Sequence, residues 1–260
     1  MEMTIENPVL FQRIGTTAVL TLNRPARLNA LTLQMLDDID VILDEIESDS
    51  EISVLVFRSA SPRFFCAGAD VNEWGAIDPE KMGSRFIRAG NRVMRRIAEL
   101  DKPTVAVLSG SALGGGLELA LSCDLRYALS SIQVGFPEAA VGAIPGWMGC
   151  QRLANLVGPA RARQMILVGA PISAATALDW GIVNGTSETL EQLDQQIQET
   201  CDLLAKRSSV SISVAKRLLR LIEPSGTEAA HEFAATVCKS TPDATEGVAA
   251  FREKRPAIFR

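Results

Sequence analysis

Segments typical of strands and of helices alternate over the first half of the chain, and this alternation is the strongest constraint on the fold. Residues 19–22, 52–57 and 104–108 are short β-prone runs, and the last two are apolar on both faces, as strands covered on both sides require. Between them, Thr32 is a typical N-cap for a helix, and Asp78, followed by proline, opens a second, long helix. Strands joined by helices pair in parallel through right-handed crossovers. The pattern therefore predicts an α/β fold with a parallel sheet.

From about residue 151 the strand signal nearly disappears. The segments with helical periodicity in this half are residues 156–168, 173–180, 188–206, 210–222 and 227–239. No linker, repeat or low-complexity tract separates the two halves, so we expect them to pack together. The sequence predicts an α/β core over residues 1–198 that carries the functional site, followed by a C-terminal helical region over residues 199–260.

Composition excludes several classes of function. The chain has five widely spaced cysteines and one histidine, His231, which we expect on the surface, so neither a His/Cys zinc site nor histidine-dependent nucleophilic catalysis is predicted. Scattered thiols and an N-terminus without a signal peptide predict a cytoplasmic protein. No stretch approaches the roughly 18 apolar residues of a membrane span. The expected chemistry therefore depends on carboxylates, backbone dipoles or a bound cofactor.

Three consecutive glycines, residues 114–116, stand between a buried strand and a helix. A single glycine there would indicate only a tight turn. Three of them leave peptide N–H groups unscreened at a helix N-terminus, where the helix dipole adds positive potential. Such a position binds an anion, or an oxygen that becomes one. The run matches neither the phosphate-binding glycine motifs nor the GxSxG nucleophile elbow.

Two glutamates are the candidate acid and base. Glu118 lies in the first turn after the glycines with apolar residues on both sides, which predicts that it is at least partly buried. Glu138 is the only charged residue between Arg126 and Arg152; it is either a loop acid near a helix cap or a second carboxylate facing Glu118. Two carboxyls in one dry pocket cannot both ionise easily, so one holds a proton while the other acts as a base.

Six short motifs follow one another along the chain. They are NRP with LNAL at 23–31, FCAGAD at 65–70, GSALGGGLELA at 110–120 with CD at 123–124, FPE with IPG at 136–146, QRL at 151–153, and FREKRP at 251–256. Together, and in this order, they resemble the crotonase superfamily, the enoyl-CoA hydratase/isomerase family. The resemblance covers nearly the whole chain.

The resemblance implies a spiral of ββα turns, C-terminal helices that build trimers or dimers of trimers, and an acyl-CoA thioester as substrate without any separate cofactor. It implies an oxyanion hole formed by the N–H groups of Ala69 and Gly115, with water activated by Glu118 and the C2 proton supplied by Glu138. The further implied contacts are Gly146 with water, Arg27, Ala67, Asp70, Val71 and Asn72 with CoA, and Phe251 and Lys254 with CoA from a neighbouring subunit.

The chain departs from the family's pattern at two places. Trp147 and Met148 follow Gly146 where hydratases often carry small residues, so we expect them to shorten or reshape the acyl pocket if the loop borders it. Asn72 stands where many relatives have lysine, which removes one cation from the CoA side. The residues expected either to line the acyl pocket or to belong to the ordinary core are Trp74, Ile77, Met82 and Phe86.

The resemblance, together with the two glutamates, implies hydration of a 2-enoyl-CoA, and three alternatives are open. One is a hydratase specialised for a branched or unusual acyl-CoA. A double-bond isomerase of the same superfamily would transfer a proton between C2 and C4 without adding water. RNA binding, known for at least one crotonase relative, would use five arginines expected on one helix: Arg85, Arg88, Arg92, Arg95 and Arg96. The net charge of −5 opposes polyanion binding, and a solvated or subunit-facing stripe is the favoured interpretation of these arginines.

Overall fold

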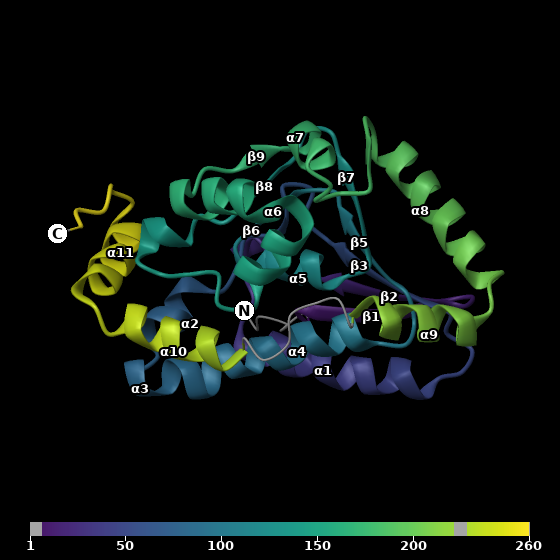
Figure 1. Ribbon diagram of the computed structural model, residues 1–260, viewed down its shortest axis with the longest axis horizontal. Coiled ribbons are helices and arrows are strands. Elements are labelled where there is room, and N and C mark those ends of the chain that lie inside the picture. The colour runs from purple at the N-terminus through teal and green to yellow at the C-terminus, as the bar shows by residue number, and fades with distance from the viewer. Residues whose placement is uncertain (1–6, 221–227, 260) are drawn as a thin grey trace, which may run out of the picture.

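The computed structural model describes residues 7–220 and 228–259, and two sheets form its centre (Figure 1). The larger sheet has six strands in the order β1-β2-β3-β5-β7-β10, of which only β1 and β2 pair antiparallel. These strands are β1 (Val9–Ile14), β2 (Thr17–Leu22), β3 (Val54–Ser59), β5 (Thr104–Leu108), β7 (Leu125–Leu129) and β10 (Gly185–Ser187).

The second sheet has four short strands in the order β4-β6-β8-β9. They are β4 (Phe64–Cys66), β6 (Ser111–Leu113), β8 (Gln133–Gly135) and β9 (Ile172–Ser173). Each successive turn of the chain places one strand in the larger sheet and the next in the smaller: β3 and β4, β5 and β6, then β7 and β8. A helical segment follows each pair, so the predicted spiral of ββα turns is confirmed.

Helices connect and cover the two sheets. Their bounds are α1 (Leu33–Ser48), α2 (Val71–Ala76), α3 (Pro79–Lys81), α4 (Arg88–Glu99), α5 (Gly115–Ser122), α6 (Gly149–Val168), α7 (Ala174–Asp179), α8 (Leu190–Ala205), α9 (Ser209–Arg220), α10 (Glu228–Lys239) and α11 (Pro242–Glu253). Thr32 caps α1 as predicted, since its side chain accepts a hydrogen bond from the N–H of Met35.

The apolar strands β3 and β5 are buried on both faces because different helices cover them. Val54 and Val56 belong to a cluster with Leu193 and Ile197 of α8. The alternate residues, including Leu55 and Phe57, point into the main core instead. This two-sided burial explains why the strands read as nearly continuous apolar runs.

The structure differs from the sequence prediction mainly in short elements. The sequence analysis missed β4, β6, β8 and β9, because strands of two or three residues are too short to display a period. The helix expected after Asp78 contains a π-helical segment, Met82–Ile87, between α3 and α4. Helix α6 starts before the expected residue 156 and is interrupted at Gly158.

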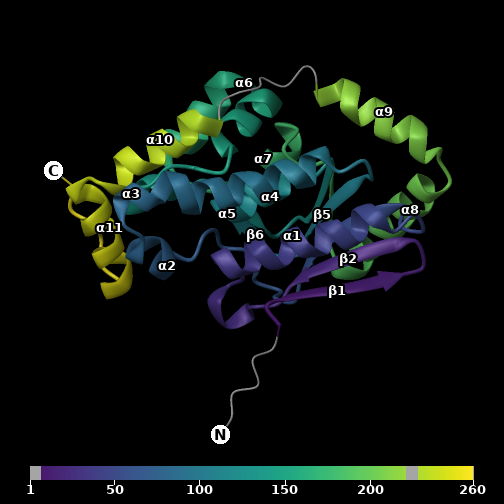
Figure 2. The ribbon, with the colours of Figure 1, turned by 90° about the horizontal axis from the view of Figure 1, so that it is seen from below.

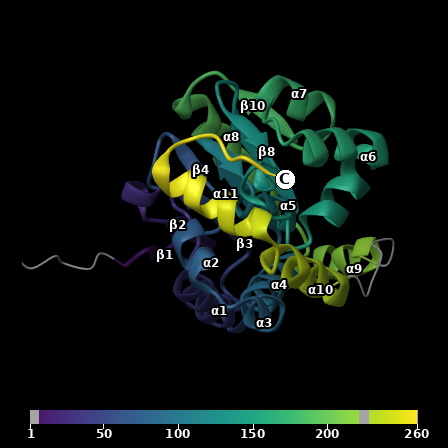
Figure 3. The ribbon, with the colours of Figure 1, turned by 90° about the vertical axis from the view of Figure 1, so that its left-hand side faces the viewer.

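The helical C-terminal region lies along the spiral rather than apart from it. Helix α10 runs beside α3 and the π-helical segment, and α11 packs on α2 and the 3₁₀ turn Glu138–Val141 (Figures 2 and 3). The predicted helix ends Ile222 and Thr227 lie outside the described residues. Residue 198 falls inside α8, so the predicted boundary crosses a helix, and the division of the chain there stays a prediction.

His231, on α10, is buried rather than exposed. The surface position expected for it is therefore wrong. The five cysteines are all free, and three of them, Cys66, Cys123 and Cys201, are buried as expected of core thiols. None of the helices in the described part of the chain is long and apolar enough to span a bilayer.

Candidate active site

The start of α5 and the turn after β4 bring two backbone N–H groups together. Gly114, with φ of 52°, ends β6 in a conformation that favours glycine, and Gly115 then begins α5. The N–H of Gly115 belongs to the first turn, where no intrahelical acceptor exists. A Cβ placed on Gly115 would lie 3.2 Å from the nitrogen of Ala69, so the two peptide groups are neighbours.

Ala69 is oriented by a bridge to Leu31. The N–H of Leu31 donates to the carbonyl of Gly68, and the N–H of Asp70 donates to the carbonyl of Leu31. Because these bonds use the groups on either side of Ala69, its own N–H faces the opposite side, toward Gly115. Gly68 has φ of 115°, which makes this approach of the two segments possible. The pair of N–H groups has the form of an oxyanion hole.

Glu118 is buried in α5, with 2% of its surface exposed, and its carboxylate is held by the backbone at the start of α6 and just before it. Its Oε1 accepts hydrogen bonds from the N–H of Trp147 at 2.7 Å and of Gly149 at 2.8 Å. Burial raises the pKa of Glu118 to about 7, although these two N–H groups and the charge of Arg152 favour the ionised form. The burial predicted from the apolar neighbours of Glu118 is confirmed.

Glu138 begins the 3₁₀ turn after β8 and reaches the same place from the other side. A Cβ on Gly114 would lie 3.0 Å from its Oε1, so the carboxyl group lies against the glycine turn. Its Oε2 is buried and has no hydrogen-bond partner in the described residues. Burial, and then the charge of Glu118, raise the pKa of Glu138 well above its usual range. The two carboxyl groups therefore interact.

A cavity of about 270 Å³ contains both carboxyl groups. The residues singled out from the sequence that line it are Ala67, Ala69, Val71, Trp74, Gly115, Glu118, Glu138, Gly146, Trp147 and Phe251, together with Phe86. Phe251, on α11, lines the cavity of its own chain, and its contact with CoA bound to a neighbouring subunit stays a prediction. The cavity brings together two carboxylates, two N–H donors and an apolar wall, the set needed to bind and polarise a carbonyl compound.

Comparison with known proteins agrees with this geometry. A family model described as enoyl-CoA hydratase/isomerase matches residues 13–260. The chain belongs to the enoyl-CoA hydratase/isomerase family.

Two curated members of the family and one solved structure illustrate the similarity. The short-chain-enoyl-CoA hydratase of Clostridium acetobutylicum is 36% identical over 252 residues, which cover 96% of each chain. The mitochondrial methylglutaconyl-CoA hydratase of Mus musculus is 34% identical, covering 93% of this chain and 79% of the relative. A crystal structure of enoyl-CoA hydratase from Bacillus anthracis superimposes with a TM-score of 0.79 at 29% identity, covering 97% of this chain and 99% of that one.

Several residues that were predicted to contact the substrate of this enoyl-CoA hydratase/isomerase family member lie outside the cavity. Arg27, Asn72 and Lys254 are exposed at the surface, and their contacts with CoA stay predictions. Asp70 caps α2 and pairs with Arg24 at 2.6 Å, which lowers the pKa of its carboxyl group against the effect of burial. Ile77 and Met82 pack in or against the core and do not line the cavity.

The sequence indicated only one of the two roles of Trp147 in the site of this family member. Its ring lines the cavity as the sequence suggested. In addition, its backbone N–H, like that of Gly149, donates a hydrogen bond to Oε1 of Glu118. A Cβ on Gly149 would lie 2.7 Å from Oε1 of Glu118, which explains the glycine. The sequence signal for this arrangement was the pair of glycines that follow Pro145, a few residues after Glu138. Nothing in the sequence around Gly90, the residue of α4 that makes room for the indole, indicated its role.

The arginines of α4 are engaged with acidic side chains of the same chain. The ion pairs are Arg88 with Glu232, Arg92 with Asp37 and Asp40, Arg95 with Glu228, and Arg96 with Asp40, Asp44 and Glu47. Arg85 is exposed. The stripe is thus largely neutralised within the chain, which weighs against nucleic-acid binding by this family member. Over residues 7–220 and 228–259, no group of three or more His, Cys, Asp or Glu could hold a metal ion.

Proposed function

We propose that this protein is an enoyl-CoA hydratase, which adds water across the C2=C3 bond of a 2-enoyl-CoA thioester to give a 3-hydroxyacyl-CoA. The observation that carries the proposal is the placement of Glu118 and Glu138 in one buried cavity beside the N–H groups of Ala69 and Gly115. The relatives that bear hydratase names agree with this assignment.

The two carboxyl groups take different parts in the proposed reaction. Glu118, held by two N–H groups, is the base that removes a proton from water while the water oxygen bonds to C3. Glu138, whose buried Oε2 has no hydrogen-bond partner among the residues that the structure describes, is the acid that gives a proton to C2. Gly146, which lines the same cavity, contacts the water in the proposed reaction. The addition involves no net oxidation or reduction, so the step needs no redox cofactor.

The N–H groups of Ala69 and Gly115 stabilise the charge that develops between these two proton transfers. When water attacks C3, the electron pair of the double bond moves toward the thioester carbonyl and gives an enolate oxygen. Two N–H donors aimed at that oxygen lower the energy of the enolate, and one such donor typically contributes about 3 kcal/mol. The dipole of α5 acts in the same direction because its N-terminus points at the same place.

The pH dependence of hydration follows from the two pKa shifts. Glu118 must be ionised to act as the base, so kcat should rise as pH increases through about 7, the pKa of this residue. Glu138 must be protonated to act as the acid, and its pKa is raised well above its usual range, so kcat should fall only at higher pH. Because the groups interact, the two limbs of the bell-shaped profile belong to the pair. A kcat that is constant between pH 5.5 and 7.5, with the fold intact by circular dichroism, would contradict the assignment.

Loss of the conjugated-thioester absorbance of crotonyl-CoA tests the function directly. The expected product is 3-hydroxybutyryl-CoA, and wild-type protein that hydrates no enoyl-CoA of any chain length would refute the proposal. Isomerisation needs only one proton-transferring group and no water, so the second buried carboxylate favours hydration. With 3-enoyl-CoA as substrate, accumulation of the 2-enoyl product without any 3-hydroxy product would identify an isomerase instead.

We also infer that the protein assembles into trimers or dimers of trimers through its C-terminal helices. Helix α9 presents an exposed apolar row at four-residue spacing, Val210, Val214 and Leu218, and α10 exposes Phe233 and Val237. Exposed apolar rows of this kind mark surfaces for association. Light scattering should give three or six times the subunit mass, and the double variant V214E/L218E should lower it. A monomeric wild-type protein at micromolar concentration would contradict this assembly.

A further inference from the structure

We propose that the indole of Trp147 closes the acyl end of the cavity and limits this enzyme to short, uncharged acyl groups. The inference rests on the proposed hydration of enoyl-CoA and specifies its substrate class. Three observations support it: the packing of the Trp147 indole, the closed end of the cavity, and the charges of the residues that line the cavity.

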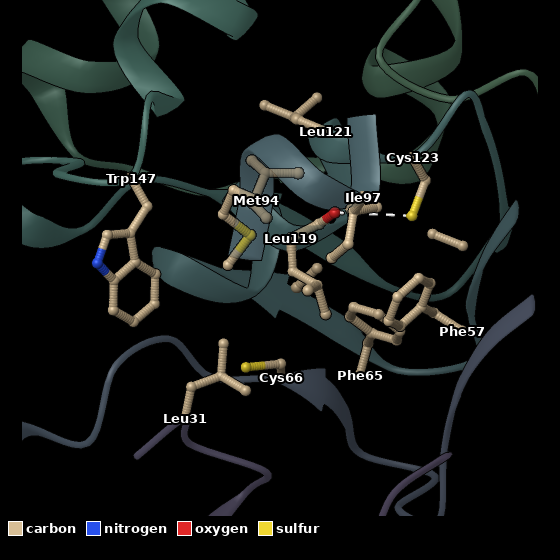
Figure 4. Close-up of a cluster of buried hydrophobic side chains, with 14 of the residues drawn as sticks. Leu31, Phe57, Phe65, Cys66, Met94, Ile97, Leu119, Leu121, Cys123 and Trp147 are labelled. Atoms are coloured by element: carbon tan, nitrogen blue, oxygen red, sulfur yellow. Dashed lines mark hydrogen bonds between the residues drawn. The ribbon is translucent and has the colours of Figure 1, made fainter. Parts of the chain in front are cut away.

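The indole occupies a slot that two glycines leave open. A Cβ on Gly90 of α4 would lie 2.1 Å from Nε1 of Trp147, and one on Gly115 of α5 would lie 2.5 Å from its Cζ3. Any other residue at either position would collide with the ring. The ring therefore spans from α4 to the glycine turn of the oxyanion hole, beside the place where a thioester would react. Figure 4 shows Trp147 in the same buried cluster as Met94 and Cys66.

The wall that contains Trp147 is the closed end of the cavity. Trp147 is only 2% exposed, whereas Phe251, on the lining of the same cavity, is 54% exposed and marks its mouth. Phe86 packs on the indole with ring centroids 5.4 Å apart, and Ile87 adjoins Gly146. A CoA thioester that enters at Phe251 thus points its acyl chain at Trp147.

The closed end is also fixed in place. The guanidinium group of Arg152 donates hydrogen bonds to the carbonyl of Trp147 and to the carbonyl of Met94, so it ties the loop to α4. The backbone N–H of Trp147 donates a hydrogen bond to Oε1 of Glu118 on the other side. Since the backbone is restrained on both sides and the ring is packed, the wall has little freedom to retreat before a longer chain.

The size and charge of the cavity point to the same substrates. Its volume of about 270 Å³ lies just below the range of small-molecule pockets, about 300 to 1,000 Å³. Apart from Glu118 and Glu138, every lining residue is apolar or glycine. A carboxylate at the end of an acyl group would meet two acidic groups and no cation on the lining itself, so dicarboxylic acyl groups are disfavoured as well as long ones.

Chain-length preference tests the proposal. We would measure kcat/KM for hydration of crotonyl-CoA (C4), 2-decenoyl-CoA (C10) and 3-methylglutaconyl-CoA, whose acyl group ends in a carboxylate. Wild-type protein should prefer C4 to C10, and C4 to the carboxylated substrate, by at least about a hundredfold, since one methylene that a pocket cannot place costs about ten- to two-hundredfold. Trp147→Ala and Trp147→Leu should each reduce the C4-to-C10 preference at least tenfold.

Trp180→Ala is the matched control, because it removes an indole that packs on Arg161 and lies away from the cavity. This variant should keep the wild-type preference. A wild-type enzyme that hydrates C10 within threefold of C4 would overturn the proposal, as would a preference that both Trp147 variants leave intact. Comparable hydration of 3-methylglutaconyl-CoA and crotonyl-CoA would overturn the exclusion of charged acyl groups.

Binding of saturated acyl-CoA separates this proposal from the proposed function. Calorimetry should give tighter binding of butyryl-CoA than of decanoyl-CoA to the wild-type protein, and Trp147→Ala should reduce the difference. If that holds while no enoyl-CoA is hydrated, the role of Trp147 stands and the reaction is wrong. If hydration occurs without a difference between the two saturated ligands, the reaction stands and the role of Trp147 is wrong.

Discussion

Replacing Glu138 by glutamine is expected to lower kcat for crotonyl-CoA hydration about a thousandfold, with little change in KM. Glutamine has nearly the same shape but cannot give up a proton, and a positioned general acid or base typically contributes 10²- to 10⁴-fold. The buried, unpartnered Oε2 of Glu138 is the atom whose proton the reaction would use. The measurement is the decay of the conjugated-thioester absorbance under saturating substrate.

Two controls distinguish a lost proton from a damaged fold. Glu45→Gln makes the same chemical change on the exposed surface of α1 and should leave kcat at the wild-type value. The thermal midpoint of Glu138→Gln should be equal to or above that of the wild type, because an amide is easier to bury than a carboxyl group with a strongly raised pKa. If Glu138→Gln kept the wild-type kcat, Glu138 would not be the acid of the reaction.

Substituting alanine for Gly115 is expected to lower kcat/KM for crotonyl-CoA about a hundred- to a thousandfold. The added Cβ would lie 2.5 Å from the indole of Trp147 and 3.2 Å from the nitrogen of Ala69, so the ring or the turn must shift. Displacing one oxyanion-hole donor typically costs about 10²- to 10³-fold. Alanine is a good helix former, so the substitution does not weaken α5 itself.

A double variant tests whether the collision is the cause. Combining Gly115→Ala with Trp147→Ala removes the Cζ3 atom that the new Cβ would meet. The double variant should then recover at least tenfold in kcat/KM over Gly115→Ala alone, measured with crotonyl-CoA. If the two substitutions together are as slow as or slower than Gly115→Ala, the steric explanation is wrong and the loss comes from elsewhere in the turn.

Much of the fold could be predicted because its signals are local. The two-sided burial of β3 and β5 was visible as apolar runs, and the start of α1 as an N-cap residue ahead of a helical period. The strands of the smaller sheet escaped detection because β4, β6 and β8 have three residues each. Their stability comes from pairing with segments far along the chain, which leaves no period in their own sequence.

The sequence by itself determined the order of elements, the burial of Glu118 among apolar neighbours and the glycine turn that frees the N–H of Gly115. Only the tertiary structure decided that Glu138 faces the same cavity as Glu118 and that Trp147 is seated between Gly90 and Gly115. The physical reason is the range of the interactions. Periodicity, capping and glycine conformation act within a few residues, whereas the coupling of two carboxyl groups and the fit of a ring depend on distances across the packed core.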